Sequence, residues 1–205
     1  MSSRKGSLCL SVLLYGALVW SCGQKPSEVA AESPAPDPVK RGEYLVSVAG
    51  CNDCHTPKVF TEQGPEPDRS RLLSGHPEDC RLPLIDPARI TPDGWLLFNN
   101  QLTAAVGPWG VSFAANITSD EETGIGRWTE DAFITTLRTG KHWGVGPAIA
   151  PPMPWQNLAL MPDEDLKAIF AYLKSTPPVR NHVPAAMTLE EYLARVKPDG
   201  TLPRP

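Results

Sequence analysis

The sequence lacks a hydrophobic run long enough to cross a membrane. Its longest apolar run, from Leu8 to Trp20, has about 13 residues, whereas a spanning helix needs about 20. Basic residues are not in excess either, because the formal net charge is -4. Without the first 21 residues, which include Arg4 and Lys5, 17 basic residues face 23 acidic ones, or -6. An acidic chain of this kind is a poor binder of nucleic acid.

The chain also lacks internal repeats, a second domain and an alternation of strands with helices. Its 205 residues suffice for one domain whose core needs no disulfide bonds. Proline is abundant, with 23 residues, and favours long irregular connections over a continuous sheet.

The N-terminus is typical of an exported protein. Residues 1–21 read as a signal peptide, with Arg4 and Lys5 before the apolar run. The run ends in "VWSC", which resembles a bacterial lipobox, although Trp20 is bulky for its position; an ordinary secretory signal is the alternative. The resemblance implies lipidation of Cys22, a Pro-rich tether over residues 22–37, and anchoring at the periplasmic face of a bacterial membrane.

Beyond the tether the pattern predicts a mostly α domain. A first helix opens at Pro38, with Tyr44, Leu45 and Val48 on one face, and delivers Cys51 and Cys54 on the same side. Residues 56–115 read as mostly loop, with a turn at 92–94 and a short strand at 95–98. Further helices are predicted at 130–139, at 162–176 and at 188–196. Thr129 caps the first of these and Gly140 ends it. The second carries an apolar stripe that comprises Leu166, Ile169, Phe170 and Leu173.

The stretch "CNDCH", residues 51–55, carries the chemistry. A redox dithiol would favour a thioredoxin-like context, which is absent here. A zinc site needs four ligands, and His76 and Cys80 could complete a Cys3His set with Cys51 and Cys54. The third interpretation is covalent attachment of one c-type haem, for which C-x-x-C-H is the motif.

With these motifs the chain resembles the class I c-type cytochromes, here of the monohaem bacterial lipoprotein type. The resemblance rests on the helix before "CNDCH", on "PPMPW" at 151–155, on "AIFAYL" at 168–173 and on "LLSG" at 72–75. It implies a cytochrome c domain over residues 38–184, in which the last helix packs against the first and "LLSG" lines the haem on the histidine side. Residues 56–115 are then an insertion, and 185–205 form a C-terminal extension with a short helix.

The resemblance also implies the iron ligands. His55 is the proximal ligand, and Met153, held between prolines, is the expected sixth ligand. Met161, Met187 and His142 are the rivals for that position. His76 and His182 are expected to be solvated loop residues.

Other residues are weaker candidates for contacts with the haem. Trp143, Trp155 and Arg138 could each donate to a haem propionate, although a core position for the indoles and a solvated helix end for the arginine are the simpler interpretations. Cys80 has no assigned role.

The expected function is electron transfer by a single haem c, without catalytic residues or a small-molecule substrate. The partners would be redox proteins, with the chain acting as a free shuttle or as the cytochrome subunit of a dehydrogenase or oxidase. The alternatives are a haem enzyme or gas sensor with an open sixth site and, less favoured, the zinc module.

Overall fold

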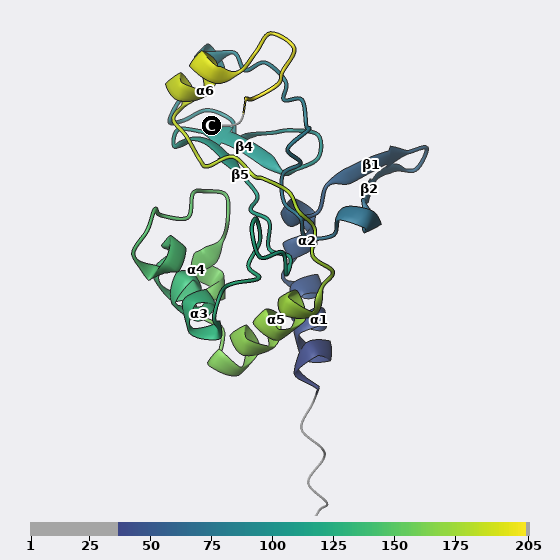
Figure 1. Cartoon of the computed structure of the whole chain (residues 1–205). Helices are drawn as coiled ribbons and strands as arrows, with labels where there is room; N and C mark the ends of the chain where they lie inside the picture. Colours follow the sequence, from purple (N-terminus) through teal and green to yellow (C-terminus); the bar gives the residue numbers. More distant parts are fainter. Residues whose placement is uncertain (1–36, 204–205) are drawn as a thin grey trace, which may run out of the picture. The chain divides into compact units, whose positions relative to one another are not determined.

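The computed structural model describes residues 37–203 (Figure 1). The predicted signal peptide, Cys22 and residues 22–36 of the predicted tether lie outside the described residues. The helices are α1 (Pro38–Val48), α2 (Cys51–His55), α3 (Glu130–Thr139), α4 (Trp155–Leu158), α5 (Asp163–Ser175) and α6 (Leu189–Arg195), with short 3-10 turns η1 (Arg69–Arg71), η2 (Pro87–Arg89) and η3 (His142–Gly144). The strands are β1 (Lys58–Thr61), β2 (Gly64–Pro67), β3 (Leu97–Phe98), β4 (Ala104–Gly107) and β5 (Gly110–Phe113). Within residues 37–203, no helix combines the length and apolarity that a bilayer span requires.

Helices α1 and α5 pack closely against each other (Figure 1). A Cβ atom on Gly42 of α1 would lie 1.9 Å from the carbonyl oxygen of Ala168 in α5, so only a hydrogen atom fits there. At the margin of the crossing, Arg41 Nε lies 3.0 Å from Asp165 Oδ1. This packing confirms the expectation that the helix bearing "AIFAYL" lies against the first helix.

The buried face of α1 differs from the prediction. Gly42, Leu45 and Val46 are buried, whereas Tyr44 and Val48 are 57% and 61% exposed. The prediction followed the large apolar side chains, but the close approach of α5 selects the face that carries glycine.

The other predicted helices are confirmed, together with their caps. The Thr129 hydroxyl accepts the Ala132 N–H at 3.2 Å, and Gly140 ends α3 in the left-handed conformation at φ 64°. The stripe of α5 is buried. It joins α1 and α3 in a cluster that we call the helical core, whose buried members are Leu45, Val46, Leu73, Ile125, Phe133, Leu137, Leu166, Ala168, Ile169, Phe170 and Leu173.

A second cluster lies between the sheet β3–β4–β5 and α6, and we call it the sheet core. Its buried members are Leu82, Ala104, Val106, Val111 and Tyr192. Val111 and Met187 pair as an isolated antiparallel bridge, and the Leu82 N–H donates to Gly200 O at 2.9 Å. The predicted insertion and the C-terminal extension therefore fold together.

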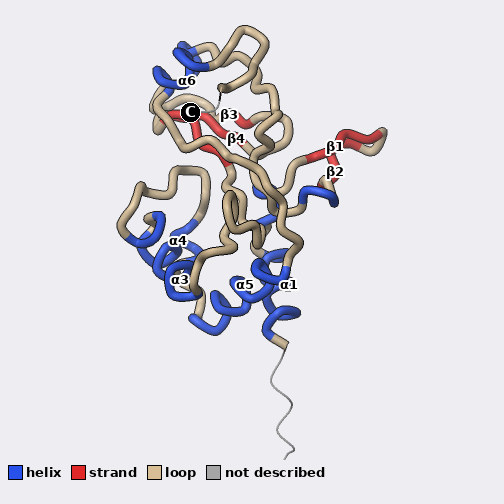
Figure 2. Tube along the Cα trace, viewed as in Figure 1, coloured by secondary structure: helices blue, strands red, loops and turns tan. Residues whose placement is uncertain are grey.

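The prediction of a mostly α domain is wrong in part, because the described chain is mixed. Residues 56–115 hold two small antiparallel sheets, β1–β2 and β3–β4–β5, and the predicted strand at 95–98 is reduced to Leu97–Phe98. Strands of two to four residues are too short for a periodic signal in the sequence. The predicted turn at 92–94 and the long loops are confirmed, as Figure 2 shows for the chain between β5 and α3.

Candidate functional site: the CNDCH helix and its surroundings

The CNDCH motif forms a short helix of its own, α2. The left-handed Gly50, at φ 69°, separates it from α1, so the two are not the single helix that the sequence predicted. Cys51 and Cys54 remain three residues apart on one helical turn, and both are half-buried free thiols.

The thiols do not have the properties of a redox pair. Burial raises the pKa of Cys51 to about 11 and also raises that of Cys54. Catalytic Cys-x-x-Cys motifs instead contain a thiol whose pKa is lowered. The site therefore offers two protonated thiols, which argues against the redox interpretation.

His55 is held in one tautomer. Its Nδ1 lies 2.7 Å from the carbonyl oxygen of Ala115. A carbonyl can only accept a hydrogen bond, so Nδ1 carries the proton and donates it. Burial lowers the pKa of His55, against the opposing effect of this hydrogen bond, and the ring is therefore neutral at pH 7. The Nε2 lone pair is left available for a metal ion, which is the arrangement that metal-binding histidines show.

The segment that carries Ala115 is fixed to the residues around "LLSG". The Gly75 N–H donates to His55 O at 2.7 Å, and the His76 N–H donates to Ala114 O at 2.8 Å. A Cβ atom on Gly75, which has φ 79°, would lie 2.4 Å from Ala114 O, so glycine is required at this approach. The structure thus places Gly75 of "LLSG" beside His55.

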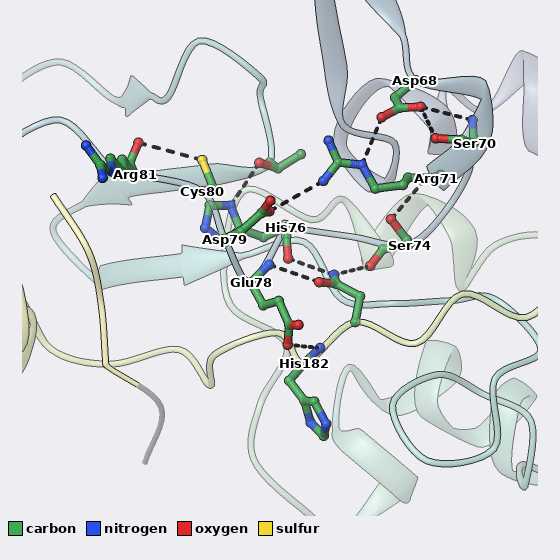
Figure 3. A network of polar contacts seen from close by, with 12 residues as sticks. Asp68, Ser70, Arg71, Ser74, His76, Glu78, Asp79, Cys80, Arg81 and His182 are labelled. Carbon is green, nitrogen blue, oxygen red and sulfur yellow. Dashed lines mark hydrogen bonds and ion pairs between the residues drawn. The ribbon is translucent and has the colours of Figure 1, made fainter.

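A polar network that is buried at Ser74, His76 and Asn181 supports this region (Figure 3). Asn181 Nδ2 donates to Ser74 O at 2.7 Å and to His76 O at 2.8 Å, and Asn181 Oδ1 accepts the Glu78 N–H at 2.9 Å. Close by, Arg71 contacts the carboxylates of Asp68, at 2.8 Å, and Asp79, at 3.4 Å. No local pattern in the sequence marks Asn181 or Ala115, because each contacts residues at least 60 positions away.

Met153 lies at the border of the helical core. It is half-buried and packs against this core, as do Cys51 and Met161. The loop before it is tied to β5, since the Ser112 hydroxyl donates to Pro151 O at 2.6 Å. Cys51 and Met153 therefore contact the same apolar cluster.

The other ligand candidates lie in different surroundings. Met187 packs against the sheet core and pairs with Val111. His142 is exposed, with its ring edge-on to Trp128 at 5.1 Å. His182 is exposed, as predicted.

The suggested propionate donors have structural roles here. Arg138 donates to the carbonyls of Ala159 and Met161 and pairs with the Asp163 carboxylate, which links α3 to the start of α5. The Trp155 ring packs against Gly140, and the Trp143 ring lies 5.0 Å from that of Trp128 at a tilt of 42°.

The described chain does not assemble the ligand set of the zinc interpretation. Among residues 37–203, no three His, Cys, Asp or Glu side chains gather so that they could hold a metal ion. Cys80 instead lines a cavity of about 260 Å³ with His76 and His182, and burial raises the pKa of its thiol.

The expectation of a solvated His76 is also wrong, because this side chain is 2% exposed. Its Nδ1 lies 2.9 Å from Thr103 Oγ1, and its ring packs 5.0 Å from that of Phe113. Thr103, just before β4, and Phe113 of β5 cover this histidine, and the sequence predicted neither of these strands. Burial lowers its pKa from the ordinary 6.5 to about 4.

His76 makes the stability of the fold dependent on pH. Between pH 6.5 and about 4 the unfolded chain binds a proton at His76 that the folded chain does not bind. The free energy of unfolding should therefore fall with decreasing pH through this window, by roughly 3 kcal/mol in total. Denaturant titrations from pH 7 to 4 would measure the slope. His76→Gln should flatten it, whereas the matched change at the exposed His182, His182→Gln, should not; equal slopes in all three proteins would contradict the prediction.

The residues of α2 fit a covalently bound haem. Two half-buried thiols three residues apart, followed by a neutral imidazole with a free Nε2, make up the attachment site of a c-type haem. When bound, this group supplies an iron centre that takes up and releases single electrons.

Comparison with known proteins agrees with this class. No protein-family model matches the chain. The cytochrome c subunit of the quinone-dependent alcohol dehydrogenase of Gluconacetobacter polyoxogenes is 33% identical over 151 residues, which are 72% of this chain and 26% of the relative. The gluconate 2-dehydrogenase cytochrome c subunit of Pantoea cypripedii is 31% identical over 65% of this chain and 22% of its own length. The fructose dehydrogenase cytochrome subunit of Gluconobacter japonicus is 31% identical over 144 residues, or 69% and 22% of the two chains.

The chain spans about a quarter or less of the length of these relatives. Over about 70% of its own length it is homologous to cytochrome c subunits of dehydrogenases, and it belongs to the c-type cytochromes.

Proposed function

We propose that the chain carries single electrons on one haem, attached through Cys51 and Cys54, with His55 Nε2 and the Met153 sulfur as axial ligands. The observation that carries the proposal is the 2.7 Å contact between His55 Nδ1 and Ala115 O. It leaves Nε2 free of its proton and holds the ring in one orientation before any ligand binds.

The surrounding residues suit electron transfer better than catalysis. Two protein side chains at the axial positions leave no position for a substrate, and a thioether opposite an imidazole raises the reduction potential. The Gly75 N–H donates to His55 O and the His76 N–H donates to Ala114 O, so residues outside α2 hold the backbone of the proposed histidine ligand. A site held in this way would need little rearrangement on each electron transfer.

The partner in this proposal is a dehydrogenase. The relatives are named as cytochrome subunits of dehydrogenases that act on alcohol, gluconate or fructose, so an enzyme of this group is the proposed electron donor. Export, lipidation of Cys22 and a position at the periplasmic membrane face belong to the same proposal. They rest on the sequence of the first 22 residues.

Absorption spectroscopy tests this function directly. The matured protein, reduced with dithionite, would be measured before and after addition of carbon monoxide. An unchanged spectrum is expected, because both axial positions are occupied. A shifted spectrum would instead favour an enzyme or gas sensor with an open sixth site, and a protein without the haem spectrum would contradict both.

Met153→Ala tests the sixth ligand. The variant should keep its covalent haem, gain a carbon monoxide response, and lower the reduction potential by on the order of 100 mV, within the range of roughly 0.8 V that axial ligands span. Met161→Ala is the matched control, because Met161 is also half-buried against the helical core. Redox titration with and without the gas measures both effects. A carbon monoxide response in Met161→Ala rather than in Met153→Ala would mean that Met161, and not Met153, is the sixth ligand.

A further inference from the structure

The hairpin β1–β2 is not covered by the rest of the described chain. Figure 1 shows it extending away from the helices and from the sheet core, and it forms a two-stranded sheet of its own. Val59 and Phe60 are 43% and 56% exposed, and as neighbours in a strand they point to opposite faces. An isolated two-stranded hairpin is marginally stable in water, so a partner strand that covers these apolar side chains would stabilise it.

The two outer edges of the hairpin differ. A two-residue turn joins the strands, so Thr61 and Gly64 form a hydrogen-bonded pair, and alternation makes Val59 and Glu66 the next one. Phe60 then lies opposite Pro65 in a pair without hydrogen bonds, and its backbone N–H and C=O point away from β2. The corresponding outer edge of β2 carries proline at positions 65 and 67, which cannot donate. The outer edge of β1 therefore remains available for a further strand, whereas that of β2 is blocked.

The exposed charge on the hairpin is negative. Glu62 lies in the turn, and Glu66 lies on β2 opposite Val59; both are exposed. Within residues 58–67 the single cation, Lys58, is turned away: its Nζ donates to Asn52 O at 3.1 Å and to Asp53 O at 3.0 Å, both in α2. An added strand that carries Lys or Arg would be attracted, whereas a second copy of the hairpin would bring further carboxylates against these two.

The same lysine contacts relate the hairpin to the haem attachment site. They fix the base of β1 to the backbone of α2, and β1 begins three residues after His55. Thr56 and Pro57, between the two, are buried. A protein bound along β1 would thus lie beside the CNDCH helix, where a donor has to approach.

We propose that the outer edge of β1 binds an extended, basic segment of the dehydrogenase partner, which adds a strand to the hairpin. The backbone groups of Phe60 form the hydrogen bonds, Val59 and Phe60 are covered, and Glu62 and Glu66 attract the basic side chains. The inference rests on the proposed function, since it names the surface that the electron donor uses.

Phe60→Pro tests the edge without breaking the hairpin. Proline at this position removes an N–H that points away from β2, as the native Pro65 already does on the other edge. Phe60→Thr is the matched control, because it also removes the aromatic ring but keeps the N–H and the preference for a strand. The full-length chain in its native membranes would be supplied with ethanol, gluconate or fructose, and haem reduction would be followed by absorption.

At subsaturating amounts of cytochrome, the Phe60→Pro protein should be reduced at least about tenfold more slowly than the Phe60→Thr protein. The dithionite-reduced spectra of both variants should equal that of the native protein. The double variant Glu62→Lys, Glu66→Lys should also slow reduction, and added salt should narrow the difference in rate between it and the native protein.

Equal rates for the proline and threonine variants would overturn the docking proposal while leaving the proposed function intact. A dimer of the native chain in solution that Phe60→Pro dissociates would overturn it in favour of a second copy. If dithionite reduces the haem of the native protein but none of the three substrates does, both the dehydrogenase partner and the docking proposal are overturned.

Discussion

Replacing both Cys51 and Cys54 with serine is expected to abolish covalent attachment of haem. Each thiol of a C-x-x-C-H motif forms one thioether bond to the haem, and a hydroxyl group cannot replace it. Each single replacement should leave one bond and lower the yield of matured protein. Haem that stays with the polypeptide after denaturing electrophoresis measures the result without requiring that the variants fold.

Cys80→Ser is the matched control for this experiment. Cys80 is likewise a half-buried free thiol with a raised pKa, but it lies in the cavity beside His76 and not on α2. This variant should retain covalent haem at the native level. Haem that remains attached to the double variant, or that is lost from Cys80→Ser, would contradict the attachment site.

Gly42→Ala is expected to cause the largest loss of stability from a single methyl group. The new Cβ atom would lie 1.9 Å from Ala168 O, 2.6 Å from the Ala168 carbonyl carbon and 2.7 Å from Tyr172 Cβ. Two of these three atoms belong to the backbone of α5, so relief requires a shift of one helix against the other. Overpacking of this kind costs about 3 kcal/mol, which outweighs the gain in helix propensity of about 1 kcal/mol from replacing glycine.

Denaturant titration of the matured protein measures this effect, and the neighbouring Glu43 supplies the control. Glu43 is exposed on the same helix, so Glu43→Ala should change the free energy of unfolding by less than about 0.5 kcal/mol. A Gly42→Ala protein as stable as the native one would mean that α1 and α5 do not cross at this residue.

Much of the helical part followed from local signals. The α5 stripe and the Thr129 and Gly140 caps of α3 are short-range patterns that tertiary packing did not override. The CNDCH motif is equally local, and it identified the haem class from five residues. The prediction failed where a helix had more than one apolar face, as in α1, and where strands of two to four residues carried too little pattern, as in residues 56–115.

The sequence by itself therefore determined the attachment chemistry of the site, because the two thiols and the imidazole lie at fixed spacing along one helical turn. The proposed sixth ligand, Met153, is 98 residues from His55 and depends on the fold. Tertiary structure decided how the site is held. His55 owes its tautomer to Ala115, sixty residues away, and His76 is buried because a distant sheet covers it. The extension at 185–205 joins that sheet through Met187 and Tyr192. Hydrogen bonds to backbone carbonyls and burial against short strands leave little trace in residue type, so only the folded chain reveals them.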